Sequence, residues 1–264
     1  MNPYSLYEKI KTVKPVIHHL TNWVTIYDCA GIVKAIGGSP VMAHAPEEME
    51  EMTSIASALV LNIGTLTVEF IESMKKAGRA ANKKGIPVIL DVCGAGATSL
   101  RNEKCFDLLD TLNISIIKGN ASEIARIAGK NVRTQGVDST ETGLNNTEIA
   151  KHLADQRQCT VVLTGATDIV AGERKTFLIK NGHPLMTSVV GTGCMAASII
   201  GTFAAVEKNL PMAAASGLVC YEVAAELASE NSRGPASFKT ALCDELYLLK
   251  KESVEKRQKV EILS

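Results

Sequence analysis

Four continuous apolar runs recur along the first two thirds of the chain, and a helix-like segment separates each from the next. The runs are residues 58–63, 86–91, 114–118 and 160–165. A strand that is apolar on both faces is typical of a parallel sheet, because helices then cover both faces. Alternating strands and helices imply right-handed crossovers within one sheet. The chain is therefore predicted to be α/β, with a central, mostly parallel sheet flanked by helices on both faces.

Further elements complete this expectation. Shorter strands are expected at 16–20, 39–42, 169–171, 176–179 and 185–190, and helices at 23–36, 67–84, 99–112, 146–157, 211–229 and 237–256. Asn181-Gly182 is a typical hairpin turn, so the region after residue 165 is expected to be antiparallel. Residues 131–145 have the composition of a long polar loop, with Asn146 capping the next helix. Without an internal repeat or a low-complexity linker, we expect one domain over residues 1–264.

A glycine-flanked turn lies at residues 189–195, which read Val-Val-Gly-Thr-Gly-Cys-Met. Gly191 and Gly193 allow a sharp turn and a close approach of the backbone to a ligand. The helix that follows points unpaired N–H groups and its positive dipole end at this turn, which suits an anion such as phosphate. Cys194 falls in the first helical turn, where a thiolate is favoured. A plain strand-to-helix connection with a buried cysteine explains the same residues.

Polar residues gather where the predicted strands end. They are Asn62, Gly64, Asp91, Gly94, Lys118, Asn120 and Glu123. Ligands of open α/β sheets bind at the carboxyl ends of the strands, where these residues are expected to lie. Ordinary surface loops are also polar, which explains the same residues without a site. Two carboxylates suit Mg²⁺, and a lysine neutralises phosphate, so the set fits phosphoryl transfer to a small molecule. The chain has no Gly-x-x-x-x-Gly-Lys-Ser/Thr motif, which excludes a P-loop enzyme.

The composition of the chain indicates which classes of binding partner it lacks the residues for. The chain carries 28 basic and 28 acidic residues and only 4% aromatics, which argues against nucleic acid and membrane surfaces. The amino-terminal residues have no signal-peptide core. None of the seven cysteines pairs at zinc-site spacing, so free thiols in a reducing cytoplasm are expected. His18 and His19 are neighbours on a strand and point to opposite faces, which favours core or surface positions over metal binding.

Several motifs together resemble the hydroxyethylthiazole kinases, a thiamine-pathway family of the ribokinase-like superfamily. They are Ser-Pro-Val-Met at 39–42, Leu-Val-Leu-Asn-Ile-Gly-Thr-Leu at 59–66, the segment 87–98, Ile-Lys-Gly-Asn-Ala-Ser-Glu at 117–123, Leu-Thr-Gly at 163–165 and Gly-Thr-Gly-Cys at 191–194. They occur in the family's order over most of the chain. Most ribokinase relatives have an aspartate base where this family, like this chain, has the cysteine.

The resemblance implies a ribokinase-like fold and the transfer of phosphate from Mg-ATP to the primary hydroxyl of 4-methyl-5-(2-hydroxyethyl)thiazole by direct in-line attack. It also implies a homotrimer with active sites between subunits. The roles that it carries over are substrate contact for Met42, Gly191, Asn22 and Gly64, nucleotide binding for Lys118, Thr164 and Asn120, Mg²⁺ binding for Asp91 and Glu123, and catalysis for Gly191, Thr192, Gly193 and Cys194.

This chain departs from the family pattern at two places. The family usually reads Asp-Pro-Val-Gly-Ala-Gly, whereas residues 91–96 here read Asp-Val-Cys-Gly-Ala-Gly. Trp23 stands where the family commonly has a small polar residue, and it would alter substrate fit if it faced the pocket.

Three other functions are compatible with parts of the pattern. One is a kinase for another small alcohol, such as a pyrimidine precursor or a sugar. Another is a hydrolase or transferase in which Cys194 is the nucleophile and His18, His19 or His183 the base. A third is a non-catalytic nucleotide sensor on the same fold.

Overall fold

Nine strands form one sheet in the computed structural model, which describes residues 1–129 and 143–263. The strand order is β2-β1-β3-β4-β5-β6-β7-β8-β9; the first six are parallel and the last three are antiparallel additions. The bounds are β1 Val16–Leu20, β2 Ser39–Val41, β3 Ala58–Asn62, β4 Val88–Asp91, β5 Ile116–Asn120, β6 Thr160–Thr164, β7 Asp168–Ala171, β8 Thr176–Ile179 and β9 Val260–Leu263. The predicted mostly parallel sheet is confirmed.

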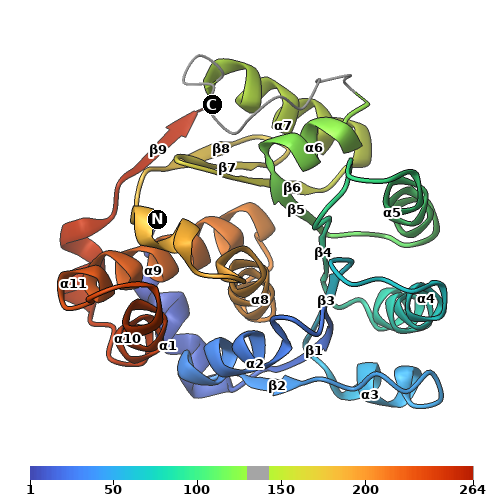
Figure 1. The fold of residues 1–264 in the computed structure, drawn as a ribbon, viewed down its shortest axis with the longest axis horizontal. Coiled ribbons are helices and arrows are strands. Elements are labelled where there is room, and N and C mark those ends of the chain that lie inside the picture. Colours follow the sequence, from blue (N-terminus) through green and yellow to red (C-terminus); the bar gives the residue numbers. More distant parts are fainter. Residues whose placement is uncertain (130–142, 264) are drawn as a thin grey trace.

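Helices cover both faces of this sheet. Figure 1 shows the sheet curving around α8, with α3, α4 and α5 on its outer side. The bounds are α1 Pro3–Val13, α2 Ile26–Ala35, α3 Met49–Ile55, α4 Val68–Lys84, α5 Ser99–Thr111, α6 Ala121–Ile127, α7 Gly143–Arg157, α8 Thr192–Ala204, α9 Leu210–Glu230, α10 Pro235–Tyr247 and α11 Lys251–Arg257. Helices on both sides of a mostly parallel sheet are the layers that the alternating pattern predicted.

Two hydrophobic cores lie on the two faces of the sheet. Ala58 and Val60 of β3 face the inner core around α8, whereas Leu59 and Leu61 face the outer core under α4. Every residue of β3 is buried because side chains alternate between two covered faces. This explains why the central strands are continuous apolar runs rather than alternating ones.

The strand expected at 185–190 is wrong. Residues Pro184–Ser188 form a short 3₁₀ helix, η1. Pro184 has the fixed backbone angle that suits a first helical position, and the His183 ring accepts a hydrogen bond from the Leu185 N–H at 3.2 Å. The apolar pattern here reflects one turn of helix that packs near the core, since periodicity cannot distinguish the two in so short a run.

The hairpin expected at Asn181-Gly182 is also wrong. β7 and β8 are joined through Gly172 and Lys175, and the far edge of β8 pairs with β9 from the end of the chain. Asn181 instead holds that end: its side chain donates to the Arg257 carbonyl at 2.8 Å and accepts from the Lys259 N–H at 2.7 Å. The antiparallel character of the region was predicted correctly, but its turn was misplaced.

Other boundaries differ in smaller ways. The segment expected as one helix at 237–256 is divided into α10 and α11, and α1 and β9 were not predicted. The helix expected at 23–36 begins at Ile26. α7 already includes Gly143, so Asn146 is not its cap; the rest of the loop expected at 131–145 lies outside the described residues.

α9 is long and apolar enough to cross a membrane by length and composition, with 21 residues and a mean hydropathy of 1.2. In the structure 72% of this stretch is buried, against α8, α10 and α1. Its apolar character is therefore that of a core helix.

Candidate active site

Strand register brings the polar strand ends into one row. Asn62 pairs with Asp91 across β3 and β4, and Asp91 pairs with Lys118 across β4 and β5. The Asn62 amide donates to Asp91 Oδ2 at 2.8 Å, and the Lys118 ammonium lies 3.4 Å from the same oxygen. All three side chains are buried. A buried carboxylate and a buried ammonium are therefore paired at the carboxyl edge of the sheet.

Cys194 lies next to this row and receives two amide hydrogen bonds. The Asn22 and Asn62 amides donate to its sulfur at 3.2 and 3.3 Å. Asn22 is held in place because its own oxygen accepts from the Thr25 N–H and hydroxyl at 3.1 and 3.0 Å. This local turn keeps Asn22 out of α2 and aims its amide at the sulfur.

The first turn of α8 faces the same space. Gly191 has a φ of 93° and forms the N-cap, and no side chain from the described residues caps the helix. A Cβ on Gly193 would lie 3.1 Å from Lys118 Nζ, so the ammonium rests against this turn. Thr192 is held from behind, since its hydroxyl donates to the Met186 carbonyl at 3.0 Å. Backbone N–H groups and an ammonium converge here, as an anion site requires.

Charge in this cluster is set by burial and by close neighbours. A hydrogen bond from Cys93 lowers the pKa of Cys194, and Thr25, Lys118 and Asn22 act in the same direction against burial. Burial raises the pKa of Asp91, although Lys118 opposes the shift. Burial alone would lower the pKa of Lys118, but Asp91 and its other anionic neighbours outweigh it and raise that pKa. The lowered pKa favours the thiolate form of Cys194 beside a charged lysine.

Glu123 and Asn120 form the start of α6. The Asn120 side chain accepts from the Glu123 N–H at 2.9 Å, and Glu123 Oε2 accepts from the Asn120 N–H at 2.8 Å, which makes a capping box. Glu123 Oε1 accepts from the Gly94 N–H at 2.7 Å. Both carboxylate oxygens are therefore engaged by backbone, which places Glu123 as an anchor of the loop after Asp91.

The other predicted residues lie along the same edge. Gly64 is joined to the cluster, since its N–H donates to the Asn62 oxygen at 2.9 Å. Thr164 ends β6, and its hydroxyl donates to the Gly119 carbonyl at 3.4 Å. Met42 follows the edge strand β2, beyond β1, and no hydrogen bond in the described parts of the chain links it to Cys194.

A buried carboxyl pair stands behind the Thr164 turn. The Asp168 carboxylate accepts from the Gly165 N–H at 2.8 Å and shares a hydrogen bond with Glu222 of α9. Burial raises the pKa of both carboxyls, and Asp168 raises that of Glu222 further. The raised pKa of Glu222 therefore favours its protonated form in the folded protein, next to the Asp168 carboxylate.

Replacing Glu222 with glutamine is expected to flatten the pH dependence of stability. In the wild type the unfolded chain loses this proton above about pH 4.3 while the folded chain keeps it, so stability falls as pH rises, by about 1.4 kcal/mol per unit. The glutamine amide donates to Asp168 at every pH. Urea unfolding between pH 5.5 and 8.5 measures the slope.

Glu226→Gln, one turn further along α9 and ion-paired with Lys259, is the matched control. Equal slopes for the wild type and Glu222→Gln would contradict the assignment of the proton.

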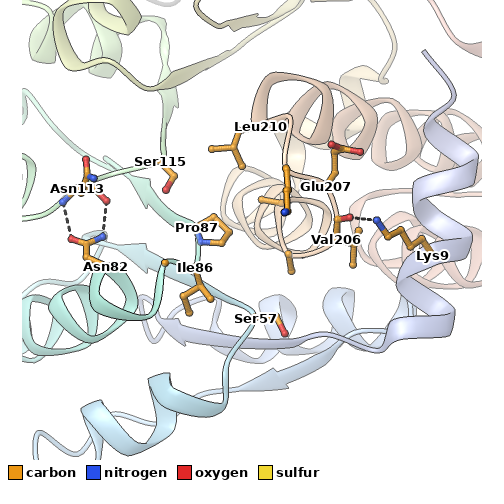
Figure 2. Close-up of a pocket in the computed structure, with 14 residues that line it drawn as sticks. Lys9, Ser57, Asn82, Ile86, Pro87, Asn113, Ser115, Val206, Glu207 and Leu210 are labelled. Atoms are coloured by element: carbon orange, nitrogen blue, oxygen red, sulfur yellow. Dashed lines mark hydrogen bonds between the residues drawn. The ribbon is translucent and has the colours of Figure 1, made fainter.

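A cavity of about 800 Å³ lies elsewhere, at the amino ends of the strands. Figure 2 shows Ser57, Pro87 and Ser115, which precede β3, β4 and β5, along its wall. Asn82 and Asn113 close one side through two hydrogen bonds of 2.8 and 2.9 Å. Because it opens at the edge opposite Asp91 and Lys118, this cavity is separate from the candidate site.

Comparisons with known proteins agree with this geometry. The hydroxyethylthiazole kinase family model matches residues 7–252. The chain belongs to the hydroxyethylthiazole kinase family. A family member from Methanosarcina mazei is 53% identical over 96% of this chain and 97% of its own length. A solved hydroxyethylthiazole kinase from Pyrococcus horikoshii superposes with a TM-score of 0.91 at 37% identity, covering 99% of each chain.

The fold extends beyond the family. A ribokinase-like superfamily protein from Enterococcus faecalis superposes with a TM-score of 0.64 at 15% identity, covering 95% of this chain and 96% of that one. At that identity the likeness shows the fold alone. The ribokinase-like fold predicted from the sequence is confirmed.

The histidines do not support a cysteine–histidine nucleophile. His18 contacts the Thr53 hydroxyl and the Ala43 carbonyl, and His19 contacts the Ser198 hydroxyl at 3.1 Å. Burial lowers the pKa of His19 to about 4, so its ring is neutral. His183 caps η1. Both His18 and His19 are buried, so of the core and surface positions that the sequence favoured, the structure has the core position.

Sequence reasoning missed three contributors to the site. Asn62 was recognised only as a polar strand end, yet it contacts both Asp91 and Cys194. Thr25 fixes Asn22 and lies against Gly191. Cys93, noted only as a departure from the family pattern, donates to Cys194. Only the register of β3 and β4 and the packing of α2 against α8 make these contacts visible.

Proposed function

We propose that this member of the hydroxyethylthiazole kinase family transfers the γ-phosphoryl group of ATP to the primary hydroxyl of 4-methyl-5-(2-hydroxyethyl)thiazole. One observation carries the proposal: the buried Lys118 ammonium lies against the uncapped first turn of α8, one residue before Cys194. Positive charge and backbone N–H groups therefore face the place where a phosphoryl group would lie beside the sulfur. Such preorganised donors are the main contribution of a protein to phosphoryl transfer.

Each residue of the cluster has a chemical task in this proposal. The N–H groups of residues 192–194 and the Lys118 ammonium bind and neutralise the moving phosphoryl group. Asn22 and Asn62 hold the Cys194 sulfur, which accepts a hydrogen bond from the substrate hydroxyl and orients its oxygen for in-line attack. Met42, Gly64 and Gly191 are proposed to contact the thiazole, and Thr164 and Asn120 the nucleotide. No covalent intermediate is needed, since the alcohol attacks directly.

The donor set fits Mg²⁺ bound together with ATP. Asp91 and Glu123 are two carboxylates at neighbouring strand ends, and Mg²⁺ characteristically takes one or two carboxylates, waters and substrate phosphates. Because the Glu123 oxygens already hold backbone N–H groups, we propose that Glu123 acts through bound water. The ion would screen phosphate charge when bound.

Cys194→Ser and Cys194→Ala are expected to retain measurable kinase activity, and Cys194→Asp to be active as well. A thiolate with a lowered pKa is a weak base, and a loose transition state needs little proton removal, so the sulfur mainly positions the alcohol. The expected loss in kcat for Cys194→Ala is no more than about 10²-fold, the low end of the loss for a positioned acid–base group. Steady-state ADP release measures it.

Complete loss of turnover in Cys194→Ala, with ATP and thiazole affinities unchanged, would contradict this expectation and make the sulfur an essential base. Cys105→Ala, a buried thiol in the core on the outer face of the sheet, is the control.

ADP release with Mg-ATP and the hydroxyethylthiazole tests the proposed function directly. Turnover that depends on both substrates is expected. A panel of pyrimidine precursors and sugars distinguishes a kinase for another small alcohol. Turnover without ATP would instead favour the hydrolase or transferase, and ATP binding without turnover on any alcohol would favour a nucleotide sensor.

An exposed apolar group beside the site supports the proposal of a homotrimer with active sites between subunits. Trp23, Val24, Tyr27 and Val190 are 74%, 65%, 86% and 70% exposed. Val190 adjoins Gly191. Gly191 lies against Thr25, which stands in the same segment of the sequence as Trp23, Val24 and Tyr27. A partner subunit covering these side chains would bury them and border the substrate space. The mass in solution, measured by light scattering, tests the trimer. We also propose that the chain forms one catalytic domain and that the enzyme acts in the cytoplasm.

A further inference from the structure

Arg101 connects two loops of the candidate site. It lies in the first turn of α5, and its guanidinium donates to the Ile63 carbonyl at 2.9 Å and to the Gly64 carbonyl at 2.8 Å. The same group donates to the Cys93 carbonyl at 3.2 Å. Ile63 and Gly64 follow β3, and Cys93 follows β4. One side chain therefore bridges the loop proposed to contact the thiazole and the loop that follows Asp91.

The hydrogen bonds of the Arg101 guanidinium go to backbone carbonyls and not to carboxylates. None of the ion pairs among the described residues includes Arg101. Its planar fork instead reaches carbonyls on two separate loops, a geometry that the single ammonium of lysine does not reproduce. The side chain is partly buried, so water competes little for these carbonyls.

The fit around Arg101 is close. Gly94 has a φ of 79°, and a Cβ there would lie 2.9 Å from the Arg101 Nη1 atom. The Gly94 N–H also donates to Glu123 at 2.7 Å. A continuous series of contacts thus runs from Gly64 through Arg101 and Gly94 to Glu123. Movement of the guanidinium would release both loops together.

We infer that Arg101 is a positioning residue: it fixes the loop after β3 against the loop after β4, so that the alcohol and the phosphoryl group meet in the right geometry. The inference rests on the proposed function for its kinetic consequence. Reacting atoms must lie within a few tenths of an ångström of their productive positions, and a loop shift of about 1 Å costs about 10²-fold in rate.

Arg101→Lys tests the inference, because lysine keeps the charge and loses the fork. We expect kcat/KM for the alcohol to fall at least tenfold, through both KM and kcat, while KM for ATP changes less than twofold. Alkylation of Cys93 by iodoacetamide, followed by peptide mass spectrometry, is expected to become at least threefold faster because its loop is released.

Arg157→Lys is the matched control. Arg157 also bridges elements, donating to Asp110 at 2.6 Å and toward the Leu109 carbonyl at 3.5 Å, on the far end of α5. Arg157→Lys is expected to lower the melting temperature by about as much as Arg101→Lys does. It is expected to leave the KM values for the alcohol and for ATP, and the rate of Cys93 alkylation, unchanged.

Kinetic constants for Arg101→Lys that match those of Arg157→Lys, together with equal Cys93 alkylation rates, would overturn the inference. A loss of kcat alone, in proportion to the folded fraction, would also overturn it. If the wild type does not phosphorylate the thiazole, the proposed function fails, and the alkylation rates still decide whether Arg101 holds the two loops.

Discussion

Lys118→Met is expected to reduce kcat/KM for ATP by about 10²- to 10³-fold, the usual cost of removing one preorganised donor from a developing charge. The methionine keeps the unbranched apolar stem of the side chain but removes the cation between Asp91 and the first turn of α8. The ATP phosphates then face the Asp91 carboxylate and the Cys194 sulfur with no cation to balance the negative charge. Steady-state kinetics with varied ATP measure the loss.

Stability should fall in the same variant. Breaking a buried ion pair from one side costs about 3–5 kcal/mol, because the remaining charge loses its partner. The double variant Lys118→Met/Asp91→Asn removes both charges and is expected to recover most of the unfolding free energy while staying inactive. Lys84→Met is the matched control, since Lys84 donates to the Ala56 carbonyl at the opposite edge of the sheet. Unchanged ATP kinetics in Lys118→Met would contradict a phosphate role for this lysine.

Gly191→Ala is expected to lower kinase activity at least tenfold and to destabilise the fold. Its φ of 93° costs a non-glycine residue about 1–3 kcal/mol. A Cβ would also lie 2.5 Å from the Thr25 Cγ2 atom, so the turn must move away from α2. Movement displaces the N–H groups of residues 192–194 and the Asn22 amide that Thr25 positions. Kinetics and urea unfolding measure the two effects.

Two variants separate backbone strain from the steric clash. Gly85→Ala introduces a side chain at a φ of 75° with no atom within 4 Å, so it reports strain alone. Thr25→Ser removes the clashing methyl group and keeps the hydroxyl that bonds Asn22. Gly191→Ala/Thr25→Ser is expected to recover part of the activity. If Gly191→Ala is as active as Gly85→Ala, the turn does not need its observed shape.

The central part of the fold was predictable because its signal is local. A strand buried on both faces is apolar along most of its length, as residues 58–61 are. Gly85 ends α4 with a positive φ, as a glycine after a helix predicts. The errors fall where a short segment is decided by distant partners. Residues 185–190 form a 3₁₀ helix instead of a strand, and β9 exists because β8 offers it a free edge.

The candidate site divides in the same way. Asp91, Lys118 and Cys194 were identifiable because each residue type stands at a strand end or in a helix turn. The amides that donate hydrogen bonds to Cys194 could not be identified in this way, because they are far apart in the sequence. Asn22 and Asn62 are separated by 40 residues, and Asn62 and Cys194 by 132. The participation of Arg101 depends on carbonyl oxygens, which carry no sequence signal at all.

The sequence by itself determined the alternation of buried strands and helices, the glycine turn before α8 and the family of the chain, because hydrophobic burial and backbone freedom are properties of each residue in its local pattern. Only the tertiary structure decided how charge is distributed at the site. Strand register places Asn62, Asp91 and Lys118 side by side, and a hydrogen bond from Cys93, together with the Asn22 amide, lowers the pKa of Cys194. Ionisation depends on neighbours within a few ångströms, and those neighbours come together only when the sheet is formed.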